Sequence, residues 1–375
     1  MKVPFLDLKR QYASIQKDVD GAISRVLSHT QFVLGPEVKS FEENLARYCG
    51  TKFAVGCASG TDALLLSLRA CGVEPGDEVI TSTFSFFATA GAISRLGAIP
   101  VFVDILPKSY NIDTSQIEKK ITPQTKVIMP VHLYGQCADM DEILSLAKRH
   151  NLRVVEDAAQ AIGASYQGKK AGGLGELGCF SFFPSKNLGG LGDGGMVTCP
   201  SDEDAELVRK LRVHGSKPKY YHSLVGYNSR LDSLQAAALS VKLKYLESWT
   251  GGRRKRAARY NQLLAGLPFE TPFEPEHNFH IYHQYTVAVP KRNELRKFLT
   301  EREVGTEIYY PLPLHLQECY ASLGYKKGSF PVAEKSSVEV LSLPIFPELT
   351  DEEQNFVAAS VREFYRDGLP ALAIN

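Results

Sequence analysis

The segment Cys179–Asn187 has the sequence CFSFFPSKN, an apolar run that ends in a lysine, Lys186. We predict a strand over Cys179–Phe183, with Lys186 just beyond its carboxyl end. A lysine normally keeps its charged head in water. Here aromatic residues precede it and a glycine-dense stretch, Gly189–Gly195, follows. Glycines let backbone approach a ligand, and a desolvated lysine has the lowered pKa that a Schiff-base nucleophile needs. Glycine-rich turns are also ordinary turns, so this segment alone does not decide the chemistry.

Short β-branched runs alternate with longer amphipathic segments on both sides of this stretch, from about residue 50 to 200. One of the helical patterns is Asp141–His150, whose apolar residues share one face. This alternation predicts an α/β fold, with a mostly parallel seven-stranded sheet covered by helices on both sides. The last strand follows a glycine-rich link with no room for a crossover helix, so we expect it to be antiparallel. The other predicted strands are Phe53–Cys57, Glu78–Thr81, Ile99–Asp104, Lys126–Val131, Arg153–Glu156 and Gly195–Cys199.

The alternation of strand and helix patterns stops after Tyr245, where a predicted helix is followed by a proline-rich segment. We predict a smaller α+β region beyond it, with strands at Gln284–Val289 and Glu303–Ile308 and a closing helix at Asp351–Arg366. The chain of 375 residues is long enough for two domains. We therefore predict a large domain over residues 1–250, which includes the N-terminal segment, and a small domain over residues 251–375.

Charge and hydropathy argue against nucleic acid and membrane as partners. Net charge is +1 and 23% of residues are charged, a near-balance that disfavours a dedicated nucleic-acid binder. We interpret the basic run Arg253–Arg256 as one solvated helix face. The first twenty residues alternate charged and apolar side chains, unlike a signal peptide. No apolar run approaches the ~20 residues of a membrane span. These patterns predict a cytoplasmic protein.

Metal and disulfide chemistry are also not indicated. The seven cysteines are odd in number and scattered, without a C-x-x-C pair, so neither a disulfide framework nor a zinc site is predicted. Histidines at positions 277, 280 and 283 fit no common zinc spacing. We predict no metal site.

Three features follow the carboxyl ends of predicted parallel strands, where open α/β sheets bind ligands. Ser59–Thr61 opens a predicted helix, Asp62–Ala70, and its free N–H groups suit a phosphate, although serine and threonine are also ordinary helix caps. Asp157 ends another strand, where a carboxylate can keep a pyridinium nitrogen protonated or simply cap a helix. Lys186 is the third feature. The convergence of all three on one edge of the sheet is stronger evidence for a ligand site than any of them alone.

Six motifs follow one another along the chain: GTDAL at residues 60–64, FSFFAT at 84–89, EDAAQ at 156–160, SFFPSK at 181–186, GDGG at 192–195 and GYNSRLD at 226–232. In this order they resemble the DegT/DnrJ/EryC1/StrS family of sugar aminotransferases, which have the fold-type-I architecture of enzymes that use pyridoxal 5′-phosphate (PLP). The resemblance covers nearly the whole chain, from Phe5–Leu8 to Leu343–Pro344. It implies PLP as the cofactor and a nucleotide sugar and an amino acid as substrates.

The resemblance also assigns a role to individual residues. Lys186 would carry the Schiff base and shuttle protons. Asp157 would pair with the pyridine nitrogen, and Gln160 would contact the hydroxyl side of the ring. Phe86 would stack on the ring, and the phosphate would be held by Gly60, Thr61 and Ser181.

Two further residues are expected to reach a neighbouring subunit. The resemblance implies that Asn228 contacts the phosphate of the neighbour's cofactor and that Arg230 lies near its substrate. It thereby implies a homodimer with shared active sites. From the residues alone, Asn228 and Arg230 could equally be helix-entry residues.

The segment Tyr309–His315 matches the family's substrate-side loop. The resemblance implies that Tyr309, Tyr310 and His315 bind the sugar or its diphosphate. A proline-rigidified connection between domains is the alternative interpretation.

The implied reaction moves an amino group from L-glutamate to a keto group of a nucleotide sugar. The segments Arg25–Val38 and Leu133–Asp139 look most like the branch that aminates C3 of UDP-linked 2-acetamido sugars for O-antigen or lipopolysaccharide assembly. This implies UDP-2-acetamido-3-keto-glucose, or its uronate, as the acceptor. Tyr309 stands where the uronate enzymes tend to have histidine, which leaves the unoxidised sugar open.

Three alternatives are retained. Enzymes that make dTDP-3-amino-deoxyhexoses share much of the pattern, and C4 aminotransferases share less of it. Sugar dehydrases share the fold but replace the Schiff-base lysine with histidine, so Lys186 speaks against them. A non-catalytic regulatory role is the alternative from a different class, and the intact set of site residues speaks against it.

Overall fold

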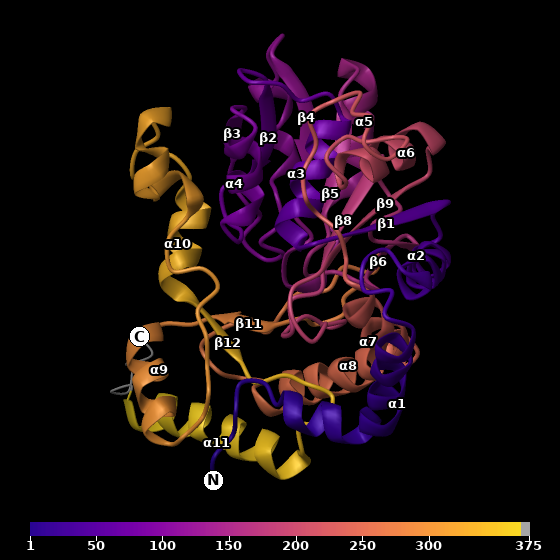
Figure 1. The fold of residues 1–375 in the computed structure, drawn as a ribbon. Helices are drawn as coiled ribbons and strands as arrows, with labels where there is room; N and C mark the ends of the chain where they lie inside the picture. The colour runs from indigo at the N-terminus through magenta and orange to yellow at the C-terminus, as the bar shows by residue number, and fades with distance from the viewer. Residues whose placement is uncertain (369–375) are drawn as a thin grey trace.

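The computed structural model describes residues 1–368, and its centre is a seven-stranded sheet. The strand order is β1-β9-β8-β5-β4-β2-β3 (Figure 1). All seven strands predicted for this part of the chain are present, with ends that differ by at most two residues. They are β1 (Phe53–Cys57), β2 (Glu78–Ser82), β3 (Ile99–Val103), β4 (Thr125–Met129), β5 (Arg153–Asp157), β8 (Leu177–Ser181) and β9 (Gly195–Cys199).

One strand of the sheet runs against the others. β9 pairs antiparallel with both β1 and β8, whereas β5 is parallel to β8 and to β4. The antiparallel last strand and the mostly parallel sheet are therefore confirmed. The glycine-rich connection before β9, residues 182–194, forms tight turns and contains no helix. It therefore cannot supply the crossover that a parallel strand usually needs, so the chain returns antiparallel.

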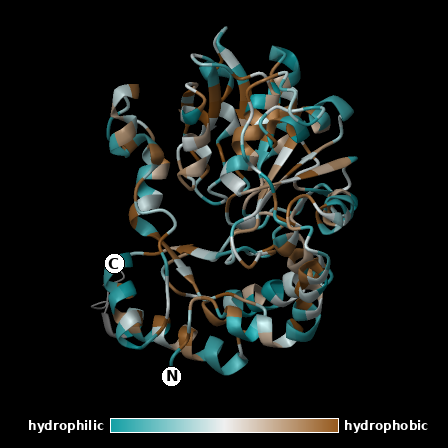
Figure 2. Cartoon of the chain, viewed as in Figure 1, coloured by the Kyte–Doolittle hydropathy of each residue, from teal (hydrophilic) through white to brown (hydrophobic). Residues whose placement is uncertain are grey.

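Helices cover both faces of the sheet because its strands are apolar on both sides. Successive residues of a strand point to opposite faces: Ile128 packs in the first of two core clusters and Val127 in the second. Figure 2 shows these apolar strands surrounded by helices with hydrophilic outer faces. The first cluster contains residues of α2 (Pro36–Cys49), α5 (Met140–His150) and α7 (Ser233–Leu243). The second contains residues of α3 (Gly60–Ala70), α4 (Ala88–Arg95) and α6 (Asp202–Leu211).

The C-terminal part of the chain has its own hydrophobic cluster around a two-stranded antiparallel sheet. The closing helix and the first predicted strand are confirmed. The elements are α8 (Leu246–Leu263), β11 (Tyr285–Ala288), α9 (Arg292–Glu301), α10 (Pro331–Glu339), β12 (Val340–Leu343) and α11 (Asp351–Gly368).

The second strand predicted for this part is wrong. Residues 303–308 form only isolated bridges, Val3 with Val304 and Glu307 with Ser342. Glu303 has a φ of 58°, a left-handed conformation that interrupts an extended run. The partner of β11 is instead β12, which we did not predict.

The N-terminus is tied to the C-terminal part. Val3 belongs to its hydrophobic cluster, and Arg10 pairs with Glu353 of α11 at 2.7 Å. Helix α1 (Leu8–His29) packs along α7 and α8 in the lower part of Figure 1. The predicted boundary at residue 250 falls inside α8, and the division into residues 1–250 and 251–375 stays a prediction.

Small elements complete the described part of the chain. A short sheet has the order β10-β6-β7. Its strands and the single-turn helices are β6 (Ser165–Tyr166), β7 (Lys169–Lys170), β10 (Asn278–Phe279), η1 (Thr114–Gln116), η2 (Glu118–Lys120), η3 (Leu133–Gly135), η4 (Leu314–Leu316) and η5 (Glu318–Leu323). No helix within residues 1–368 is long and apolar enough to cross a bilayer.

The basic run at residues 253–256 is not a solvated face. The Arg253 side chain is buried and donates to the carbonyl oxygens of Tyr282, His283 and Ile345. Its neighbour Arg254 donates to Glu274 at 2.7 Å. The guanidinium of Arg253 therefore holds the chain just before β11 against α8. A pattern of charge along one helix could not reveal these carbonyl partners, which are distant in sequence.

Candidate active site

A pocket of about 600 Å³ lies at the carboxyl ends of the parallel strands. The strand ends, the turn before α3 and the segment after β8 all reach it. Nine of the twelve predicted site residues line it: Gly60, Thr61, Phe86, Asp157, Gln160, Ser181, Lys186, Tyr309 and Tyr310.

Lys186 enters the pocket from a tight turn after β8. Its backbone N–H donates to the carbonyl of Phe183 at 2.8 Å, and the next turn is closed by Gly190 N–H to Phe182 O at 2.7 Å. Burial lowers the pKa of the Lys186 amine to about 8, although the negative charge of Asp157 acts in the opposite direction. A lysine with this pKa is neutral in about one molecule in ten at pH 7, against fewer than one in a thousand for a solvated lysine. The structure therefore presents an amine that can act as a nucleophile and a base.

Asp157 ends β5, and its side chain is buried at the pocket wall. Its Oδ2 accepts a 2.7 Å hydrogen bond from the hydroxyl of Thr89, and its Oδ1 accepts one of 3.3 Å from the N–H of Ala159. Burial raises the pKa of Asp157, whereas the bonds from Thr89 and Ala159 and the charge of Lys186 act against that rise. This carboxylate can hold a proton on a basic ring nitrogen.

The turn Ser59–Thr61 forms a cradle at the N-terminus of α3. Ser59 caps the helix by accepting from Asp62 N–H at 3.1 Å. A Cβ at Gly60 would lie 2.5 Å from Cβ of Ser181, so the approach of these two segments requires glycine. The N–H groups of the first turn have no partner within the helix and, together with the helix dipole, favour a phosphate.

The same pocket also has an aromatic face. The ring of Phe86 is 57% exposed and lines the pocket. Gln160 stands nearby, donating from Nε2 to the hydroxyl of Tyr310 at 2.9 Å and accepting from Tyr134 N–H at 2.9 Å. An uncovered aromatic ring in a pocket suits stacking on a flat, heteroaromatic ligand. The lysine, the carboxylate, the cradle and this ring together fit PLP.

The comparison with known proteins agrees with this geometry. The sequence profile of the DegT/DnrJ/EryC1/StrS aminotransferase family matches residues 13–362. The chain belongs to this family. It is an aminotransferase, and PLP is its cofactor.

Three relatives span almost the full chain. A "pleiotropic regulatory protein" of Geobacillus stearothermophilus is 54% identical, over 98% of this chain and 99% of its own. The UDP-N-acetyl-3-dehydro-alpha-D-glucosamine 3-aminotransferase of Acidithiobacillus ferrooxidans is 44% identical, over 96% and 97%. The dTDP-3-amino-3,4,6-trideoxy-alpha-D-glucose transaminase of Streptomyces venezuelae is 46% identical, over 97% and 96%.

Solved structures are also similar. DesV of S. venezuelae, crystallised with a ketimine intermediate, has a TM-score of 0.95 and 46% identity, over 97% of this chain and 98% of that one. The sugar aminotransferase Spr1654 of Streptococcus pneumoniae in its PLP form has a TM-score of 0.89 and 26% identity, over 94% and 97%. The predicted fold class, family, aminotransferase activity and cofactor are thus confirmed.

Three predicted site residues of this family member do not line the pocket. Asn228 is exposed and Arg230 is half-buried, both outside it. His315 is buried beneath the pocket wall, where its Nδ1 lies 2.7 Å from the hydroxyl of Thr83 and its Nε2 lies 3.1 Å from Glu334. The proposed roles of these three residues stay predictions.

Two polar residues that line the pocket, His283 and Gln284, were not predicted to belong to the site. The Nδ1 of His283 lies 2.9 Å from Oδ1 of Asn187, and Gln284 is only 5% exposed, with no partner for its Oε1 among residues 1–368. Burial lowers the pKa of His283 well below its usual range, and the charge of Lys186 adds to this effect. His283 is therefore a neutral acceptor in the aminotransferase pocket. The only sequence signal for His283 was its position directly before a predicted strand, which does not indicate a site residue.

His283 is one of three nearby histidines, with His277 and His280, whose spacing fits no common zinc site. The imidazole of His280 instead stacks on Tyr282 at 4.0 Å. Within residues 1–368, no three histidine, cysteine or acidic side chains converge in a way that could hold an ion.

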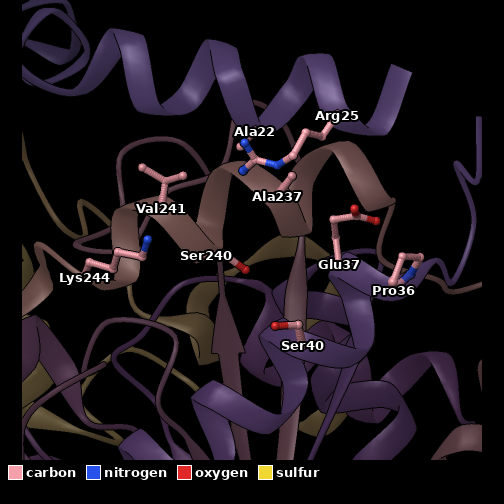
Figure 3. A pocket seen from close by; sticks show the side chains of 9 residues that line it. All are labelled: Ala22, Arg25, Pro36, Glu37, Ser40, Ala237, Ser240, Val241 and Lys244. Carbon is pink, nitrogen blue, oxygen red and sulfur yellow. The ribbon is translucent and has the colours of Figure 1, made fainter. Parts of the chain in front are cut away.

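A second cavity, of about 300 Å³, lies between α1, α2 and α7 (Figure 3). Arg25 and Lys244 reach into it from different sides, and the side chains of Ser240 and Ser40 lie below them in this view. Glu37, on the far rim, is tied to His29 at 2.9 Å. This cavity contains neither the lysine nor the carboxylate of the aminotransferase site.

Proposed function

We propose that this enzyme moves an amino group from L-glutamate to the C3 keto group of a nucleotide-linked sugar. The favoured acceptor is UDP-2-acetamido-3-keto-glucose or its uronate. One observation carries the proposal: Lys186 and Asp157 line the same pocket, together with the phosphate cradle at Gly60. We also propose that the enzyme works in the cytoplasm and that its product enters O-antigen or lipopolysaccharide assembly.

Asp157 and Lys186 have different roles in the proposed reaction. PLP supplies, when bound, a reactive carbonyl and a ring that withdraws electrons. Asp157 keeps a proton on the ring nitrogen. Lys186 Nζ takes the proton from Cα of the amino-acid donor and later delivers a proton to C3 of the sugar. An amine with a pKa of about 8 suits both directions of transfer, because each protonation state is populated near neutral pH.

The nature of the sugar is supported by the segment that closes the pocket. Tyr309 and Tyr310 line it, and the Tyr310 hydroxyl is bonded to Gln160. A phenol offers a hydrogen bond but no positive charge to a carboxylate. This favours the neutral acetamido sugar over its uronate. The 46% identity to the dTDP-sugar transaminase makes a dTDP-3-keto-6-deoxyhexose the alternative acceptor.

We further propose a homodimer in which Asn228 and Arg230 complete the partner's site. Both residues lie outside the pocket of their own chain. The loop around them is unusually apolar for a free surface, with Tyr220 78% exposed and Val225 89% exposed. The loop before α2 adds two more exposed apolar side chains, Phe32 and Val33. Exposed apolar side chains of this kind mark protein interfaces.

The first experiment is spectroscopic. The purified protein with PLP should show a visible absorption band that L-glutamate bleaches, and the Lys186→Ala variant should show neither change. UDP- and dTDP-3-ketosugars are then added separately to the bleached protein. Return of the band with the UDP-acetamido sugar supports the proposed acceptor, whereas return only with the dTDP sugar identifies the alternative.

The regulatory name of the relative at 54% identity gives the second candidate function, a non-catalytic role. The same experiment separates the two. A protein that shows no band with PLP, or a band that no amino acid bleaches, would contradict catalysis and favour the regulatory role.

Shared sites are tested by mixing two inactive variants. Lys186→Ala and Asn228→Ala subunits are unfolded together, refolded and assayed. Half of the dimers should be mixed, and each mixed dimer has one intact site, so about one quarter of wild-type activity should return. If each site uses only residues of its own chain, no activity returns.

A further inference from the structure

Two buried hydroxyl groups form a chain that ends on Asp157. Thr89, at the start of α4, donates to Asp157 Oδ2 at 2.7 Å, and Ser85 lies 2.8 Å from the Thr89 hydroxyl. All three side chains are buried. Neither hydroxyl belongs to the set predicted for cofactor or substrate contact.

The direction of these hydrogen bonds follows from the charge of Asp157. An ionised carboxylate can only accept, so Thr89 must donate its single hydroxyl hydrogen to Oδ2. The Thr89 oxygen is then left as an acceptor, and Ser85 must be its donor. The chain Ser85→Thr89→Asp157 therefore has this direction only while Asp157 carries its negative charge.

The arrangement also distinguishes the two oxygens of Asp157. Oδ2 is bonded to Thr89, which does not line the pocket. Among residues 1–368, Oδ1 accepts only the long 3.3 Å bond from Ala159 N–H. Oδ1 is thus the oxygen with hydrogen-bonding capacity left for a group in the pocket.

We propose that Thr89 and Ser85 are positioning residues, which hold Asp157 ionised and turned so that Oδ1 meets the ring nitrogen of PLP. This inference rests on the role proposed above for Asp157. It adds two residues that act through Asp157: Thr89 lies behind the pocket wall, whereas Ser85 also lines the pocket.

The surroundings of Asp157 explain why such a chain is needed. Burial favours the protonated form of a carboxylate, and a hydrogen bond to the charged form opposes that effect. Thr89 is the foremost of the contributions that lower the pKa of Asp157. The other ionisable groups that interact with Asp157 are Lys186, His132, Cys179 and Tyr310. Of these, Lys186 and His132 act in the same direction as Thr89.

The test compares Thr89→Val, which keeps the shape and removes the hydroxyl, with Thr89→Ser, which keeps the hydroxyl. Ser85→Ala removes the outer link, and Asp157→Asn is the reference for complete loss. Thr81→Val is the matched control, because Thr81 is also buried and donates to the Met129 carbonyl at 2.7 Å, away from the pocket. Two quantities are measured on each protein: the Kd of PLP for the apoprotein, and the pH midpoint of the visible absorption change.

Thr89→Val should raise the Kd of PLP about tenfold, equivalent to about 1.4 kcal/mol. Its pH midpoint should move upward, because a carboxylate without its donor is more basic and leaves less positive charge on the ring. Ser85→Ala should raise the Kd two- to threefold, by the loss of one link in a hydrogen-bond chain. Thr89→Ser and Thr81→Val should match the wild type in both quantities.

Equal Kd values and equal pH midpoints for Thr89→Val and wild type would overturn the inference, as would a loss in Thr89→Val that Thr89→Ser does not recover. Thermal unfolding of the apoproteins checks the fold, and Ser85→Ala carries the test if Thr89→Val does not fold. A failure of the proposed function looks different. In that case Asp157→Asn itself binds PLP as the wild type does, with the same pH midpoint.

Discussion

Asn187 Oδ1 accepts a 2.9 Å hydrogen bond from Nδ1 of His283, so the residue directly after Lys186 fixes an imidazole from the C-terminal part of the chain. The amide of Asn187 is itself oriented, because its Nδ2 donates to the carbonyl of Ile281. The backbone carbonyl of His283 is held by Arg253. His283 is therefore fixed at both ends, as the Nδ1–H tautomer, with Nε2 left as an acceptor.

This arrangement predicts a role for His283 in catalysis. His283→Ala should lower kcat/KM for the sugar about tenfold, because the loss of one hydrogen-bond acceptor costs about 1 to 1.5 kcal/mol. Asn187→Ala should cause part of the same loss, since it frees the imidazole. A double-mutant cycle of steady-state kinetics measures the coupling. Strictly additive losses would show that Asn187 does not act through His283.

The lowered pKa of Lys186 predicts how the apoprotein takes up its cofactor. Only the neutral amine attacks a carbonyl. The neutral fraction rises as pH increases towards the pKa of about 8 and is nearly complete above it. The rate of PLP incorporation, followed by visible absorbance in stopped flow, should increase up to about pH 8 and then level off. A rate that keeps rising towards pH 10 would indicate an ordinary, solvated lysine.

The cradle depends on the absence of a side chain at Gly60. Gly60→Ala should weaken PLP binding by tenfold or more, because the new Cβ would lie 2.5 Å from Cβ of Ser181 and push the two phosphate-facing segments apart. Gly251→Ala is the control, since no atom in the described part of the chain, residues 1–368, lies within 4 Å of a Cβ there. In the interior of α8 that change should be neutral or stabilising by up to about 1 kcal/mol. Titration of each apoprotein with PLP gives the Kd. Equal Kd values for Gly60→Ala and Gly251→Ala would contradict the role of the cradle.

A buried carboxylate next to Asp157 predicts an effect on stability. Glu156 is buried and accepts hydrogen bonds from the N–H groups of Gly172, Leu174 and Gly175, and its Oε2 lies 2.9 Å from His132. Glu156→Gln should lower the free energy of unfolding by about 3 kcal/mol, because it removes the charge that satisfies buried donors.

Its control is Glu118→Gln. Glu118 pairs with Arg149 and His150 on the surface, with 56% of its side chain exposed. Surface ion pairs contribute roughly 0 to 1 kcal/mol to stability. Glu118→Gln should therefore hardly change the free energy of unfolding, measured in urea at a fixed protein concentration. Equal losses in the two variants would contradict the structural role of Glu156.

The sequence by itself determined the sheet and the reactive residues. Each buried strand is a short apolar run, and the reactive residues stand at or shortly after the end of a run, as Asp157 and Lys186 do. Such features are local, because strand length and strand ends are set by neighbouring residues. Six motifs in order then identified the family, and with it the cofactor.

Only the tertiary structure decided which side chains serve these residues. Thr89 lies 68 positions before Asp157, and His283 lies 96 positions after Asn187. The burial of Arg253 and the pairing of β11 with β12 likewise depend on chain segments far away in sequence. A hydrogen bond between distant residues leaves no periodic pattern along the chain, because it depends on how whole elements pack. Short stretches of sequence are therefore enough to predict which residues are reactive. Their orientation and charge, in contrast, are set by the packing of the sheet against the C-terminal part.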